Sequence, residues 1–168
     1  MGRVRKFLHL SSRDQLFLVK TAGLVGLIRL GLWVLPFQTL GRLLTKLSPA
    51  TPAPPSNPVA ANRIGWAVDI TSRYIPDATC LTQALAAQFL LKRRGVAAEL
   101  RIGVAKSATG QFEAHAWVES DGQVVIGGVE SPHRFAAFPS LELDVRPNLD
   151  IKSKNWYPHQ YEDRNRSG

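Results

Sequence analysis

Residues 79–95, TCLTQALAAQFLLKRRG, decide the fold together with the apolar stretches that follow them. Apolar residues recur through 79–94 at helical spacing, and Gly95 is typical of a residue that ends a helix. Strand signals then cover residues 97–105, 112–119 and 123–127. Asp121-Gly122 separates the last two strands and predicts a tight hairpin turn. The sequence therefore predicts an α+β fold, with helices packed on a small antiparallel sheet of three or four strands.

Upstream of this core, the sequence predicts another helix from Val59 to about Ile75, because Pro76 disfavours helical backbone in the residue before it. Residues 48–58 contain five prolines, which favour extended polyproline II and indicate a linker. The chain is thus expected to divide into four parts. These are a basic, apolar helical segment at 1–47, the linker at 48–58, the main domain at 59–143 and a polar tail at 144–168.

The net charge of +8 is unevenly distributed. Up to Lys46 the chain has eight basic residues and one acidic residue, Asp14, whereas the remainder carries thirteen basic and twelve acidic residues. A nearly neutral main domain argues against nucleic-acid binding. Lys20 and Arg29 interrupt the apolar run of the first segment, so no uncharged stretch reaches the ~20 residues needed to span a bilayer. The segment is expected to pack on the domain or on a partner, or to lie on a membrane surface.

A single cysteine excludes an internal disulfide and fits a reducing compartment. We therefore expect a cytoplasmic protein, with residues 1–47 as a candidate contact to the inner face of the membrane. The four histidines are scattered singly, so neither a metal site nor a cofactor is expected.

Cys80 and His115 are the candidate catalytic pair. Cys80 follows Thr79 and Asp77, either of which could cap the helix that begins there, and a helix N-terminus favours the reactive thiolate. His115 lies in the middle of a predicted strand, on a face that is too polar for a simple core surface. A cysteine at a helix start and a histidine on a strand are the nucleophile and base that thiol chemistry requires. An inert buried cysteine with a structural histidine remains the alternative.

Three motifs carry a resemblance to a known family. They are Pro76-x-x-x-Cys80-Leu81-x-Gln83-Ala84-Leu85, then Leu100-Arg101-Ile102-Gly103-Val104, then His115-Ala116-Trp117-Val118-Glu119 with Asp121-Gly122. Between about residues 60 and 143, the chain resembles the transglutaminase-like leader peptidases of lasso-peptide biosynthesis. The resemblance implies a papain/transglutaminase-like fold and a cysteine peptidase that cuts the leader from a ribosomally made precursor. It also implies two protein partners, a separate leader-binding protein and an asparagine-synthetase-like cyclase, and it marks Gln83 and Trp117 as candidate substrate-binding residues.

The family's triad usually ends in an aspartate on the strand after the histidine, and here the sequence departs from that pattern. Counting from the Asp121-Gly122 turn pairs Trp117 with Ile126 and His115 with Gly128, which has no side chain. Glu130 lies two places further on the same face and is the candidate orienting residue, with Glu113 and Asp77 as alternatives. The missing aspartate leaves two other readings open, an amidase or acyltransferase and a non-catalytic peptide-binding scaffold.

Overall fold

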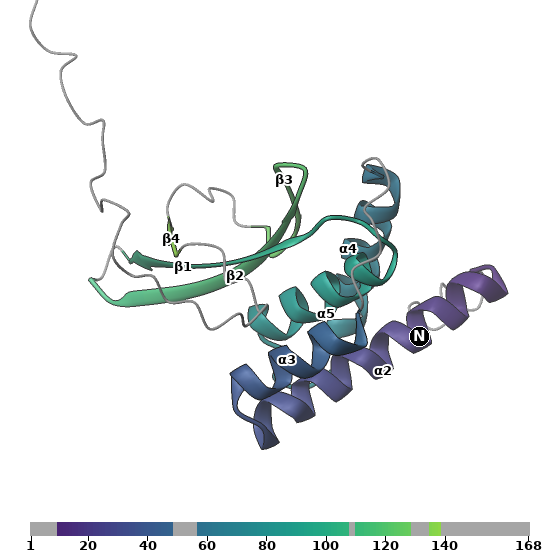
Figure 1. Ribbon diagram of the computed structural model, residues 1–168, viewed down its shortest axis with the longest axis horizontal. Coiled ribbons are helices and arrows are strands. Elements are labelled where there is room, and N and C mark those ends of the chain that lie inside the picture. The colour runs from purple at the N-terminus through teal and green to yellow at the C-terminus, as the bar shows by residue number, and fades with distance from the viewer. Residues whose placement is uncertain (1–9, 49–56, 108–109, 129–134, 139–168) are drawn as a thin grey trace, which may run out of the picture.

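The computed structural model describes residues 10–48, 57–107, 110–128 and 135–138. Within these residues, helices stand on one side of an antiparallel sheet (Figure 1). The helices are α2 (Ser12–Val34), α3 (Phe37–Leu47), α4 (Pro58–Ser72) and α5 (Cys80–Arg93), and the strands are β1 (Glu99–Lys106), β2 (Phe112–Ser120), β3 (Gln123–Ile126) and β4 (Ala136–Ala137). The predicted α+β class is confirmed.

The ends of α4 and α5 follow from local chemistry. The Thr79 side chain caps α5 by accepting a hydrogen bond from the backbone N–H of Thr82 at 3.4 Å, and Gly95 follows the helix with a positive φ of 70°. At the start of α4, the Asn57 side chain accepts from the N–H of Ala60 at 2.9 Å. Pro58, which was expected in the linker, is the first residue of α4, where a missing N–H costs no helical hydrogen bond.

The sheet has the strand order β3-β2-β1-β4. Asp121 and Gly122 both have positive φ, 51° and 73°, as a tight hairpin turn requires, and Ser120 lies opposite Gln123 as predicted. β4 was not predicted, because a strand of two residues is too short to show alternation. It pairs with β1 at Gly103 and Val104.

The predicted register between β2 and β3 is wrong beyond the turn. Val118, not Trp117, lies opposite Ile126, because a β-bulge makes Val125 an extra residue on β3. The predicted pairing of His115 with Gly128 therefore fails as well. Helix α4 packs directly on this bulge, since a Cβ atom at Gly65 would lie only 2.3 Å from the carbonyl oxygen of Val125. Pairing residues outward from the turn could not reveal this bulge, because the contact with it comes from a helix more than fifty residues upstream.

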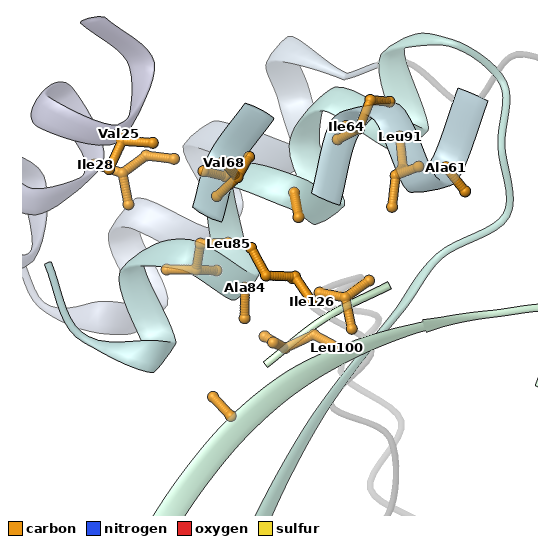
Figure 2. Packing of buried hydrophobic residues seen from close by; sticks show 14 of the residues in the cluster. Val25, Ile28, Ala61, Ile64, Val68, Ala84, Leu85, Leu91, Leu100 and Ile126 are labelled. Carbon is orange, nitrogen blue, oxygen red and sulfur yellow. The ribbon is translucent and has the colours of Figure 1, made fainter. Parts of the chain in front are cut away.

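The core lies between the helices and the sheet, and α2 contributes to it (Figure 2). Val25 and Ile28 of α2 are fully buried in one cluster with side chains from α4, α5 and the sheet, among them Ile64, Val68, Leu85, Leu100 and Ile126. The N-terminal segment was expected to pack on the domain, on a partner or on a membrane surface. For its described part, the structure shows that it packs on the domain. A second, smaller cluster comprises Ala105, Trp117 and Phe135.

We predict that Ile28→Ala lowers the free energy of unfolding by about 2–5 kcal/mol, because the change leaves a cavity in the shared core. The neighbouring Leu27, which is 68% exposed, provides the matched control. Leu27→Ala should change the free energy of unfolding by no more than about 0.5 kcal/mol. Chemical denaturation of both variants measures the difference. Equal, small effects would show that α2 does not share the core of the domain.

Candidate active site

Cys80 is the first residue of α5, directly after the capping residue Thr79. Its side chain is half-buried, and it is the sole cysteine of the chain. Helix geometry leaves the first backbone N–H groups of α5 without carbonyl partners inside the helix. Cys80 therefore lies at the positive end of the helix dipole, in the turn that carries these N–H groups. The sulfur therefore has the setting of a nucleophile, with N–H donors nearby for an oxyanion.

Cys80 and His115 line the same open cleft, whose volume is about 470 Å³. Helix α5 contributes Cys80 and Gln83, strand β2 contributes His115, and residues 125–128 complete that side of the cleft. The imidazole is half-buried, and its ring stacks on Trp117 with a centroid distance of 6.3 Å and lies 5.5 Å from the ring of Phe135. The two residues predicted as nucleophile and base are thus brought to one cavity from segments 35 positions apart.

A backbone carbonyl holds the imidazole. Nε2 of His115 lies 3.0 Å from the carbonyl oxygen of Gly127. Because a carbonyl can only accept a hydrogen bond, Nε2 is the nitrogen that carries the proton. Nδ1 is then unprotonated and can act as the base. Gly127 thus occupies the place where a triad carboxylate would be expected, and it supplies a neutral acceptor instead of a charged one.

Gly127 can take this place only because it has no side chain. Its φ is 81°, in the left-handed region, and a Cβ atom there would lie 2.7 Å from the carbonyl oxygen of Ala116 and 2.8 Å from the Cα of Trp117. Gly128, by contrast, has open space at its Cβ position. The glycine that contacts the imidazole of His115 is therefore Gly127, whereas the unbulged register predicted Gly128.

Two of the remaining candidate orienting residues lie elsewhere. Asp77 is exposed and forms an ion pair with Arg29 of α2 at 3.6 Å. Glu113 is at an exposed position of β2 opposite Ala105, and neither carboxylate lines the cleft. Glu130 falls outside the described residues, so its proposed role stays a prediction.

The substrate-binding candidates differ in their placement. Gln83 faces the cleft one turn after Cys80. Trp117 is only 2% exposed and is not among the residues that line the cleft. Its indole N–H donates to Glu119 at 2.7 Å, which fixes the ring that stacks on His115.

Two further residues of the cleft were missed in the sequence. Trp66 and Asp69 of α4 also line it, beside Gly65. Trp66 is 42% exposed, and the carboxylate of Asp69 accepts from Arg73 at 2.6 Å. A solvent-facing tryptophan one helical turn before a carboxylate is a weak signal, because nothing in the sequence links the outer face of α4 to Cys80. Among the described residues, no group of three or more His, Cys, Asp or Glu side chains could hold a metal ion.

A family profile described as the transglutaminase-like superfamily matches residues 24–140. The match covers most of the chain, so the protein belongs to the transglutaminase-like superfamily, which includes cysteine peptidases. It begins within α2, and it includes Cys80, His115 and the segment around Gly127. No curated protein and no solved structure shows a significant match to the chain.

We predict that Gly127→Ala displaces the carbonyl from His115, since the added methyl group collides with backbone atoms of β2 and the positive φ is strained. The ¹⁵N chemical shifts of the imidazole, which report its tautomer, should lose the Nε2–H pattern, and the unfolding midpoint should fall. Gly128→Ala is the matched control and should leave both readouts unchanged. A Gly127→Ala protein that keeps the His115 tautomer would contradict a positioning role for this carbonyl.

Proposed function

We propose that the chain is a cysteine peptidase that removes the leader from a ribosomally made lasso-peptide precursor. The single observation that carries the catalytic part is the shared cleft, in which Cys80 at a helix start and a carbonyl-held His115 both lie. The lasso-peptide substrate rests on the three sequence motifs around Cys80, Leu100 and His115. The open shape of the cleft is compatible with an extended peptide that enters from solvent.

In the proposed mechanism, Nδ1 of His115 accepts the proton of the Cys80 thiol. The sulfur attacks the carbonyl carbon at the leader–core junction, and the N–H groups at the start of α5 stabilise the oxyanion. The imidazolium then gives its proton to the leaving amine as the C–N bond breaks, which frees the N-terminus of the core peptide. Water activated by His115 hydrolyses the thioester, releases the leader and regenerates the thiol.

The neutral carbonyl of Gly127 affects the reaction steps in which His115 is a positively charged imidazolium. A carboxylate would attract the transient imidazolium electrostatically, whereas a carbonyl offers only a dipole. The orientation of the ring is kept, but part of the charge stabilisation is lost. We therefore expect a working, comparatively slow hydrolase, which suits a substrate that is a single dedicated peptide.

The proposed partners follow from the same substrate. A leader peptide needs a recognition surface, and we propose that a separate leader-binding protein supplies it. The freed amine would be consumed by an asparagine-synthetase-like cyclase that closes the macrolactam. The proposed compartment is the cytoplasm, where a ribosomally made precursor and a free thiol coexist.

A non-catalytic peptide-binding domain is the second candidate, and the glycine at the triad position favours it. A thiol-reactive probe distinguishes the two readings. Because Cys80 is the sole cysteine, every adduct reports this position. Labelling at neutral pH that is much faster than for a free cysteine, and that slows in His115→Ala, supports the hydrolase. Labelling at the rate of a free cysteine in both proteins supports the scaffold.

We predict that Cys80→Ala and His115→Ala each reduce cleavage of the cognate precursor by several orders of magnitude, on the order of 10³-fold or more, because nucleophile and base act as a unit. Mass spectrometry of the peptide products measures the loss. Phe112→Ala, at an 82% exposed residue of β2, provides a control for handling and purity. Near-normal cleavage by Cys80→Ala would refute the proposed function.

Trp66→Ala should raise KM for the precursor roughly tenfold, equivalent to about 1.4 kcal/mol, and leave kcat within a few-fold. The reason is that the exposed indole can pack on the peptide bound in the cleft but does not touch the reacting atoms. Asn62→Ala, at an exposed position of α4 that does not line the cleft, is the comparison variant and should leave both constants unchanged. A fall in kcat without a change in KM would contradict a binding role for Trp66.

A further inference from the structure

The outward face of α2 is largely apolar from Leu16 to Val34. This helix lies at the side of the helical layer furthest from the sheet (Figure 1). Its inward face buries Leu18, Thr21, Val25 and Ile28. The large apolar side chains exposed on the other side are Leu16, Val19, Leu27, Leu30, Trp33 and Val34, with exposed fractions of 53–78%. A contiguous apolar surface of this kind marks an interaction site.

The contacts that the inward face of α2 makes with the domain limit how its outward face can meet a membrane. Among the described residues, α2 is the one helix long and apolar enough to cross a membrane. However, Val25 and Ile28 are buried against the rest of the domain, so lipid cannot surround the helix while the domain is folded. An orientation parallel to a membrane plane leaves these contacts intact. In that orientation only the outward face enters the lipid, along a helix about 34 Å long at 1.5 Å per residue.

The charges beside the apolar face are positive. Lys20 borders it, and α3 exposes Arg42 and Lys46 next to Leu43 and Leu47. Such mixtures of leucine and basic side chains suit the boundary between acyl chains and anionic headgroups.

The single acidic residue of this region does not compensate these charges. Asp14 is paired with Arg63 of α4. The hydroxyl of Ser11, together with the guanidinium of Arg63, lowers the pKa of this carboxyl, so it is ionised and already engaged. A second copy of the chain would bring the same basic residues together without an acidic counterpart, which disfavours a symmetric dimer through α2.

We propose that α2 and α3 form a membrane-surface site that binds anionic lipid. In this arrangement Leu27, Leu30 and Trp33 enter the outer part of the acyl region, while Lys20, Arg42 and Lys46 contact lipid phosphates. The site lies on helices that do not line the cleft around Cys80, so the proposal does not depend on the reaction that Cys80 performs.

The experiment is co-sedimentation of the full chain with vesicles of phosphatidylcholine, with and without 30 mol% (about one lipid in three) phosphatidylglycerol. We expect strong partition to the anionic vesicles, weakened by salt. The double variant Leu27→Glu/Leu30→Glu should lower the partition coefficient on the order of a hundredfold, since each leucine contributes roughly tenfold when buried. Arg42→Gln/Lys46→Gln should lower it roughly tenfold on anionic vesicles alone.

The matched control is Phe112→Glu, which replaces an even more exposed apolar residue on β2 and should leave binding unchanged. Circular dichroism checks that every variant is folded. Three results would overturn the proposal. They are a wild-type chain that stays in the supernatant, a dimer that Leu27→Glu/Leu30→Glu dissociates in light scattering, and a chain that alkaline carbonate cannot release from the vesicles, which would indicate a spanning helix.

Discussion

The close approach of α4 to strand β3 at Gly65 is the constraint on which the site depends. A Cβ atom at this position would lie 2.3 Å from the carbonyl oxygen of Val125, so the backbones of helix and strand approach each other closely. Val125 is the extra residue of the bulge, and it lies two positions before Gly127, whose carbonyl oxygen is 3.0 Å from Nε2 of His115. One helix–strand contact thus connects the core to the residue that holds the imidazole.

Among the described residues, a main-chain carbonyl holds the imidazole where a triad carboxylate would be expected. A carbonyl can fix the tautomer and the orientation of the imidazole as a carboxylate does, but it brings no charge to the imidazolium. The left-handed backbone and the crowding by Ala116 and Trp117 restrict position 127 to glycine. Glycine at this position therefore lets the carbonyl approach the imidazole, whose ring also stacks on Trp117.

Helix α2 has two faces with different physical roles. The inward face of α2 shares a core with α4, α5 and the sheet, which explains why the family match begins inside this helix. The outward face carries apolar side chains beside uncompensated basic ones, and the fold provides no cover for them within the described residues. Stability accounts for the first face, and the proposed lipid surface accounts for the second.

The sequence by itself determined the fold class, the helix that begins at Cys80, the Asp121-Gly122 turn and the two candidate catalytic residues. Each of these follows from local rules, because caps, turns and periodicity depend on neighbours in the chain. Tertiary structure alone decided the bulge at Val125, the role of Gly127 and the entry of Trp66 and Asp69 into the cleft. These depend on how closely α4 approaches β3, a distance set by packing between segments some sixty residues apart. The sequence could not reveal the role of Gly127, because this residue acts through its backbone carbonyl group, which every residue has.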